Sequence, residues 1–309
     1  MHDDDLQQTE QPIVVTGLTR MFGRKTALKN VDLSVSRGRV FGLVGENGAG
    51  KTTLIRHLTG SLKAQQGSVR VFGRDPVKDP EGVLGRIGYL SEERELPHWM
   101  RVEELMHYTK AFYPGWDMSY AEELRRMFRL DASAKVKELS QGQQARAALL
   151  TALAYHPPLL LLDEPSSGLD PVVRRDILGA IIRAAADEGR TVLFSSHLLD
   201  EVERVADDVA MIHEGEIVMC APLEDIRASH HRVTLRFSEP PAKPPHLPGA
   251  LSIEGKSGQW TALYEGELDE LRAAAKAMGC EIFEETPPTL EDIFVARVGV
   301  DRAALREGE

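Results

Sequence analysis

The segment GENGAGKT, residues 45–52, has the residue types of a loop that holds phosphate groups. It follows the apolar stretch RVFGLVG and opens a helical stretch, as the pattern G-x-x-x-x-G-K-[ST] requires. Gly45, Gly48 and Gly50 let the backbone approach an anion, and the free N–H groups of the helix start face it. We expect Lys51 to reach terminal phosphates and the Thr52 hydroxyl to bind Mg²⁺. A glycine-rich turn without a ligand would not explain why the motif lies between a strand and a helix.

Two adjacent carboxylates, Asp163 and Glu164, end the apolar run LLLLDEP. At the tip of a buried strand beside the phosphate loop, Asp163 can hold Mg²⁺ and Glu164 can polarise an attacking water. Such a pair in isolation would be read as an acidic turn that caps the next helix. Beside a phosphate loop, the pair predicts a core that binds ATP or GTP with Mg²⁺.

A second candidate anion site is LSQGQ, residues 139–143, at the head of an Ala- and Leu-rich helix. The free N–H groups and the dipole of a helix N-terminus attract negative charge. The chain thus has two candidate anion sites, and a phosphate loop alone does not explain why a second one is present.

The elements around these residues indicate an α/β domain from Ile13 to about Cys220. Parallel strands covered on both faces are indicated by the apolar runs LLLLDEP and TVLFSSH. The segment between them, PVVRRDILGAIIRAAADEGR, is typical of a crossover helix. PIVVTGLTRMF and VDLSV predict antiparallel strands added at an edge. Residues 102–144 hold helices with no strand between them, which predicts an inserted helical subdomain.

The character of the sequence changes after Cys220. Strands are expected at HRVTLRF, near Leu251–Ile253, near Trp260–Tyr264 and at CEIFEE, and helices at ELDELRAAAKAMG and TLEDIFVARVG. We therefore expect an α/β domain over residues 13–222 and a small α+β domain over residues 223–309. Residues 1–12 are expected to form a disordered acidic tail. His230 and His231 are interpreted as surface residues.

Composition limits the classes of partner. The net charge of −11, from 37 basic and 48 acidic residues, argues against nucleic acid or an anionic membrane surface as the main partner. The longest apolar candidate for a membrane span, residues 147–162, is interrupted by Tyr, His and two Pro residues. The acidic start of the chain does not resemble a signal peptide. Cys220 and Cys280 lack the spacing of a disulfide framework or a metal site, which favours a reducing compartment.

Taken in order, the motifs resemble those of the nucleotide-binding subunits of ATP-binding-cassette (ABC) proteins over Ile13 to Cys220. GENGAGKTT resembles Walker A, IGYLSEE the Q-loop region, LSQGQ the LSGGQ signature, LLLLDEP Walker B, SSGLD the D-loop, and SSHLLDEVE the switch-histidine segment. Phe22 in MFG resembles the aromatic residue that stacks on adenine. The resemblance implies a P-loop NTPase core of the ABC ATPase type, with an antiparallel edge subdomain and an inserted helical subdomain.

In that family the signature of one subunit contacts the γ-phosphate held by the Walker A loop of the other. The resemblance thus implies a homodimer that sandwiches two ATP molecules, with ATP and Mg²⁺ as cofactors. It assigns catalysis to Glu164, His197 and Lys51, and the metal to Thr52, Asp163 and Glu92. It assigns nucleotide binding to Phe22, Gly45, Asn47, Gly48, Gly50, Lys51, Thr52, Thr53, Ser140, Gly142, Gln143 and Asp170.

Two residues depart from the family pattern. Gln141 replaces the third-position glycine of the signature, which removes the freedom to adopt positive φ. Glu92 replaces the usual glutamine of the Q-loop, which adds negative charge near the phosphates. We expect a working site with altered metal or pH dependence.

The resemblance implies an ATP-hydrolysing subunit that drives a separately encoded transmembrane permease from the inner face of the cell membrane. Trp99 and Met100, in RELPHWMRVEELM, are candidates for the docking surface; packing onto the helical subdomain is the alternative. TPPTLEDIFVAR and FYPGWD resemble bacterial exporter ATPases. The competing hypothesis is a soluble ABC ATPase of DNA repair or translation. Such proteins usually carry two cassettes or zinc insertions and basic surfaces, whereas no nucleic-acid partner is expected here. A P-loop kinase would leave LSQGQ unexplained.

Overall fold

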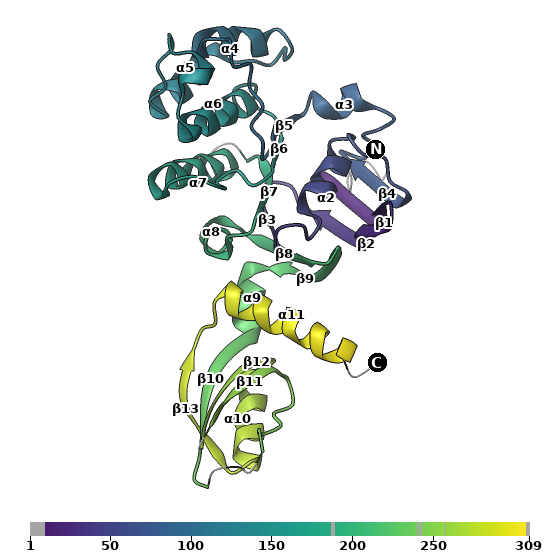
Figure 1. Ribbon diagram of the computed structural model, residues 1–309, viewed down its shortest axis with the longest axis vertical. Coiled ribbons are helices and arrows are strands. Elements are labelled where there is room, and N and C mark those ends of the chain that lie inside the picture. Colours follow the sequence, from purple (N-terminus) through teal and green to yellow (C-terminus); the bar gives the residue numbers. More distant parts are fainter. Residues whose placement is uncertain (1–9, 187–188, 240, 242, 257, 307–309) are drawn as a thin grey trace. The chain divides into compact units, whose positions relative to one another are not determined.

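The computed structural model describes residues 10–186, 189–239, 241, 243–256 and 258–306 (Figure 1). The first nine residues of the expected N-terminal tail lie outside this range. The chain divides into two compact units, residues 1–220 and 221–309. The division falls two residues before the boundary expected from the sequence.

A six-stranded sheet forms the centre of the first unit. Its strands, in order across the sheet, are β5 (Ile87–Leu90), β6 (Leu159–Leu162), β7 (Thr191–Ser196), β3 (Val40–Val44), β8 (Asp208–His213) and β9 (Glu216–Pro222). The pairs β5–β6, β6–β7, β7–β3 and β3–β8 are parallel. Every residue of β3, β6 and β7 is buried, as expected for parallel strands covered on both faces. The carboxyl ends of these three neighbouring strands therefore open onto the same edge.

A second, antiparallel sheet has the order β2-β1-β4. It comprises β1 (Ile13–Phe22), β2 (Lys25–Val35) and β4 (Gln66–Val71), the last not foreseen from the sequence. Helix α2 (Lys51–Leu58) contributes Leu54, Ile55 and Leu58 to a core cluster that also contains residues of both sheets. The helix that follows the phosphate loop is thus fixed by apolar packing from two sides.

The helical subdomain contains α4 (Val102–Lys110), α5 (Met118–Met127), a 3₁₀ turn (Val136–Glu138) and α6 (Gln141–Leu153), which are grouped together in Figure 1. Asp117 caps α5 by accepting from the N–H groups of Ser119 and Tyr120. The short α3 (Pro80–Leu84) precedes β5, α7 (Pro171–Ala186) joins β6 to β7, and α8 (Leu199–Val205) joins β7 to β8. Among the described residues, no helix combines the length and apolar character needed to cross a membrane.

The second unit is a four-stranded antiparallel sheet with helices. It comprises α9 (Leu223–Ser229), β10 (His230–Phe237), β11 (Ala250–Lys256), β12 (Gln259–Glu265), α10 (Leu268–Ala277), β13 (Cys280–Thr286) and α11 (Leu290–Arg306). The strand order is β11-β12-β10-β13. The interpretation of His230 as a surface residue is wrong: its side chain is buried, and Nδ1 lies 2.8 Å from the carbonyl oxygen of Ile226 in α9. His231 is half-buried.

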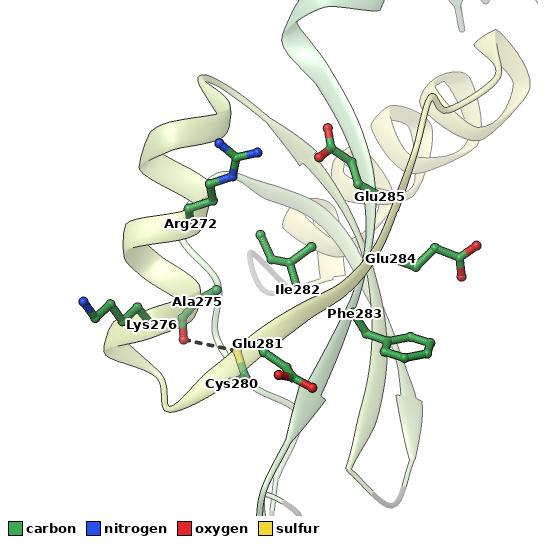
Figure 2. A pocket seen from close by; sticks show the side chains of 9 residues that line it. All are labelled: Arg272, Ala275, Lys276, Cys280, Glu281, Ile282, Phe283, Glu284 and Glu285. Carbon is green, nitrogen blue, oxygen red and sulfur yellow. Dashed lines mark hydrogen bonds between the residues drawn. The ribbon is translucent and has the colours of Figure 1, made fainter.

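The hollow shown in Figure 2 lies between α10 and the edge strand β13. Ile282 points toward α10, whereas Phe283 and Glu284 point away from it. The register of β13 shifts against β10 between Ile282 and Glu284, and the strand carries Glu281, Glu284 and Glu285. Irregularity and charge protect a sheet edge from pairing with further strands. None of the site residues expected from the sequence lies here.

Candidate functional site

The phosphate loop connects the carboxyl end of β3 to the start of α2, and its glycines are needed for different reasons. Gly48 and Gly50 have φ values of 84° and 119°, which side chains rarely adopt. Gly45 has no such φ, but a Cβ there would lie 2.3 Å from the carbonyl oxygen of Ile212. The loop can therefore approach β8 closely and turn its N–H groups toward an anion.

The ammonium group of Lys51 folds back over this loop. Its Nζ donates to the carbonyl oxygens of Gly45 at 2.7 Å and Glu46 at 3.2 Å. It also forms an ion pair with Glu164 Oε1 at 3.0 Å, and both side chains are only 5% exposed. The loop's own carbonyls and one carboxylate thus surround this cation.

Glu164 lies between two charged or ionisable partners. Its second carboxylate oxygen is 2.7 Å from His197 Nδ1, across from the Lys51 contact. The backbone at Glu164 has φ 48°, a left-handed conformation that is rare for non-glycine residues. That sharp turn after β6 directs the carboxylate back over the sheet edge, and non-glycine residues in such conformations gather at functional sites.

Asp163 is held by its neighbour strand. Ser195 in β7 donates to Asp163 Oδ1 at 2.7 Å, and the same hydroxyl accepts from the N–H of Glu164 at 2.9 Å. Burial raises the pKa of the Asp163 carboxyl above its ordinary value, while hydrogen bonds from Ser195 and Thr52 oppose that shift. The Asp163 carboxylate is thus held beside the Thr52 hydroxyl.

A cavity of about 290 Å³ lies beside Lys51, Thr52 and Glu164, whereas Asp163 and His197 are not part of its lining. Its lining contains Phe22, Lys25, Ala27, Asn47, Gly48, Gly50, Lys51, Thr52, Thr53, Glu92 and Glu164. Phe22 is 45% exposed, and the guanidinium of Arg20 lies 4.7 Å from its ring centroid. Sequence reasoning missed Lys25 and Ala27 in β2 as well as Ser195. In the pairing of β6 with β7, Leu162 lies opposite Phe194. The next residues along the two chains, Asp163 and Ser195, therefore lie beside each other.

The signature residues form a separate structure at the start of α6. The N–H of Gln143 donates to Ser140 Oγ at 3.2 Å, and the N–H of Ser140 donates to Gln143 Oε1 at 2.9 Å. This capping box uses the Ser140 hydroxyl as an acceptor and leaves its proton for another group. Gln141 is the first residue of the helix and has no positive φ. This position therefore does not require the backbone freedom of a glycine.

Two further motif residues have structural contacts. A Cβ on Gly142 would lie 2.7 Å from Val173 Cγ2 in α7, so glycine allows α6 to approach α7 closely. Asp170 Oδ1 accepts from the N–H groups of Val172 at 2.9 Å and Val173 at 3.1 Å, and so caps α7. None of the described residues lining the 290 Å³ cavity belongs to LSQGQ or SSGLD.

Replacement of Gly142 by Ala is expected to lower ATP turnover several-fold, because the new methyl group pushes the start of α6 away from α7. Binding of a fluorescent ATP analogue to the isolated chain should change little. Gly179→Ala is the matched control: Gly179 lies within α7, and the nearest atom to its added Cβ is Arg183 Nη1 at 3.7 Å. Equal turnover of the two variants would contradict the packing argument.

Comparison with known proteins places this arrangement in one family. The chain matches the family described as ABC transporter over residues 28–167. YhaQ, an uncharacterized ABC transporter ATP-binding protein of Bacillus subtilis (strain 168), is 33% identical over 307 residues, covering 93% of this chain and 98% of the relative.

Solved structures agree with this match. A structure of an ATP-binding subunit of an ABC transporter matches with a TM-score of 0.64 at 29% identity, over 70% of this chain and 91% of that one. The dimeric structure of MJ0796, a bacterial ABC transporter cassette, matches with a TM-score of 0.62 at 25% identity, over 68% and 98%. The chain belongs to the ATP-binding-cassette family. It is an ATPase, of the kind that forms the ATP-binding subunit of ABC transporters.

Proposed function

We propose that this chain hydrolyses ATP as one half of a two-chain sandwich and thereby drives export through a separately encoded membrane permease. One observation carries the proposal. Among the described residues that line the cavity beside Lys51 and Glu164, none comes from the signature, although Ser140 caps a helix whose N-terminus suits a phosphate. A γ-phosphate contact from LSQGQ would therefore come from a second copy of the chain, in an isologous dimer.

The proposed roles within one cavity follow from the contacts. ATP phosphates would draw Lys51 away from Glu164 and onto the β- and γ-phosphates, while adenine stacks on Phe22. Glu164 would then accept a proton from the water that attacks the γ-phosphorus, with His197 orienting both. The bond from the γ-phosphorus to the bridging oxygen breaks, and ADP and phosphate result. ADP lacks the group that the partner's Ser140 and Gly142 would contact, so hydrolysis reopens the dimer.

The donor set beside the loop fits a hard divalent cation. The Thr52 hydroxyl and the Asp163 carboxylate are oxygen ligands held together at the sheet edge, with Glu92 on the cavity wall. Mg²⁺ bound there with nucleotide would neutralise charge on the β- and γ-phosphates. Ser195 supports this role because its hydrogen bond fixes the Asp163 carboxylate.

Exposed aromatic side chains on the helical subdomain and in the loop just before it support a permease partner. Trp99 is 71% exposed, and Tyr108 and Phe112 are 47% and 62% exposed, with ring centroids 5.0 Å apart. Large exposed apolar groups of this kind suit a docking surface. Met100 does not contribute, because it is buried, and its carbonyl oxygen accepts from the N–H of Val136 in the helical subdomain. We place the chain in the cytoplasm, at the inner face of the cell membrane.

The competing function, a soluble ABC ATPase of DNA repair or translation, is less well supported. Nucleic-acid surfaces are usually basic, whereas the chain has a net charge of −11. YhaQ, which covers nearly the whole chain, is named an ABC transporter ATP-binding protein. The export direction follows from the likeness of the C-terminal segment to exporter ATPases.

Replacement of Glu92 by Gln tests the unusual carboxylate on the cavity wall. Removal of this negative charge is expected to strengthen binding of the ATP anion. Replacement of a carboxylate oxygen by a neutral amide oxygen is expected to weaken Mg²⁺ binding and so to raise the Mg²⁺ concentration for half-maximal turnover several-fold. Titration of ATPase activity with Mg²⁺ measures the second effect. Glu93→Gln, an exposed neighbour, is the control. An unchanged Mg²⁺ dependence and pH profile would make Glu92 a tolerated variant.

The transporter proposal is tested by capture of the permease. A tagged Glu164→Gln variant, expected to bind ATP and remain in the closed dimer, is isolated from detergent-solubilised membranes with ATP and Mg²⁺. We expect a polytopic membrane protein that is absent from an untagged control and is lost when Trp99 is also replaced by Ala. Ribosomes, nucleic acid or soluble proteins alone would contradict the transporter proposal and leave the ATP sandwich standing.

A further inference from the structure

A buried carboxylate outside the nucleotide cavity joins the loops that carry the proposed catalytic groups. Glu201 lies in the first turn of α8 and is only 1% exposed. Its Oε2 accepts from the hydroxyls of Ser166 and, at 3.4 Å, Ser196. Its Oε1 lies 3.2 Å from Arg174 Nε in α7. One carboxylate thus contacts the loop after Glu164, helix α7 and the end of β7.

The positions of the two serines link this carboxylate to the site. Ser166 follows Glu164 by two residues, at the far side of Pro165. Ser196 directly precedes His197 at the end of β7. Ser166 donates to one oxygen of Glu201, and the Ser196 hydroxyl lies 3.4 Å from the same oxygen and 3.4 Å from the carbonyl oxygen of Leu198. The carboxylate thus contacts the chain just beside each of the two side chains that meet at 2.7 Å.

The backbone of the same loop has independent supports. Arg94 Nη2 donates to the carbonyl oxygens of Ser167 at 2.7 Å and Pro165 at 3.4 Å. Arg174 Nη2 donates to the carbonyl oxygen of Leu169 at 3.3 Å. The Arg94 contacts do not involve Glu201, whereas Arg174 also pairs with its carboxylate. Arg94 therefore holds the overall course of the loop when only the Glu201 carboxylate is changed.

Burial of this carboxylate has a cost that its partners only partly offset. Burial raises the pKa of Glu201 above its ordinary value, against the hydrogen bond from Ser166 and the attraction of Arg174. An apolar residue of similar size is often at least as stabilising as a buried ion pair. A geometric requirement explains the carboxylate better than stability does. One of its oxygens faces both serine hydroxyls while the other faces the Arg174 guanidinium, and an amide, with a single acceptor oxygen, cannot do both.

We propose that Glu201 is a positioning residue for ATP hydrolysis: through Ser166 and Ser196 it fixes the distance between Glu164 and His197. The inference rests on the catalytic roles proposed for that pair. Glu201 itself does not line the nucleotide cavity. Its loss therefore lowers turnover without weakening nucleotide binding.

The test compares Glu201→Gln with Asp200→Asn in a steady-state ATPase assay of the purified chain. Both substitutions remove one negative charge from the first turn of α8, but Asp200 is exposed. We expect Glu201→Gln to lower kcat by about tenfold to a hundredfold, since small misplacements of reacting groups have effects of this size. The KM for ATP and the binding of a fluorescent ATP analogue should change little, and Asp200→Asn should retain normal kcat. Equal kcat in the two variants, or a loss confined to KM, would overturn the proposal.

A double-variant cycle separates this proposal from the roles on which it rests. If Glu201 acts through Glu164, Glu201→Gln lowers single-turnover hydrolysis far less in a Glu164→Gln background than in the wild type. Full additivity would overturn the positioning role. Wild-type turnover by Glu164→Gln would instead contradict the proposed catalytic function. The double variant Ser166→Ala, Ser196→Ala leaves the fold's apolar core unchanged and should reproduce the kcat loss; normal turnover by this variant would also overturn the proposal.

Discussion

The replacement of Glu164 by Gln is expected to slow ATP hydrolysis by about 10²- to 10⁴-fold, the usual contribution of a general base. The amide cannot accept the proton of the attacking water. The same change removes the ion pair that holds Lys51 at 3.0 Å in the absence of nucleotide. Lys51 then meets the phosphates without first leaving a carboxylate, so ATP should bind more tightly to the variant. Hydrolysis is measured by phosphate release and affinity by titration with a fluorescent ATP analogue.

A matched control for this substitution exists at the end of β8. Glu214 has φ 47°, nearly the same left-handed backbone as Glu164, but its side chain is 70% exposed. Glu214→Gln changes the same chemical group in the same backbone conformation and should leave both hydrolysis and affinity unchanged. Normal turnover by Glu164→Gln would show that another group takes the proton, and weaker ATP binding would contradict the competition between Glu164 and ATP for Lys51.

Much of the site could be predicted because its motifs are local in sequence and their supporting strands are parallel. Gly45–Thr52, Asp163–Glu164 and His197 each follow a strand of the same sheet, and β6, β7 and β3 are neighbours. Ligand sites of open α/β sheets form at the carboxyl ends of such strands. The sequence therefore indicated which residues would meet, and the structure brings Lys51, Glu164 and His197 within hydrogen-bonding distance.

Other residues could not be foreseen because their partners are distant in sequence and depend on register. Ser195 reaches Asp163 only because β6 pairs with β7 in one register, and a shift of one residue would turn the serine to the opposite face. Lys25 reaches the cavity only because β2 folds back on β1. Glu201 was one acidic residue among several in DEVE, and nothing local marked it as buried.

Exposure proved hardest to infer. Adjacent histidines in a strand point to opposite faces, which led to a surface assignment for His230, but α9 covers that end of β10. Trp99 and Met100 are adjacent apolar residues, yet one is 71% exposed and the other 3%. In both cases tertiary packing determines whether the side chain is buried, which the local sequence pattern does not specify.

The replacement of Lys51 by Ala is expected to abolish measurable ATP binding and also to destabilise the nucleotide-free chain. Lys51 and Glu164 are each only 5% exposed, so removal of the cation leaves a buried carboxylate without its main counter-charge. Breaking such a pair from one side typically costs about 3–5 kcal/mol. Urea unfolding without nucleotide measures the loss, with a change in midpoint and no change in slope if the fold is intact.

The double variant Lys51→Ala, Glu164→Gln separates the two effects. If the loss of stability comes from the unpaired carboxylate, neutralising Glu164 should restore much of the free energy of unfolding, whereas ATP binding stays absent because the phosphates still lack the lysine. A double variant as unstable as Lys51→Ala alone would instead trace the loss to the Lys51 hydrogen bonds with the carbonyls of Gly45 and Glu46. The loop's shape would then depend on the lysine even when no phosphate is bound.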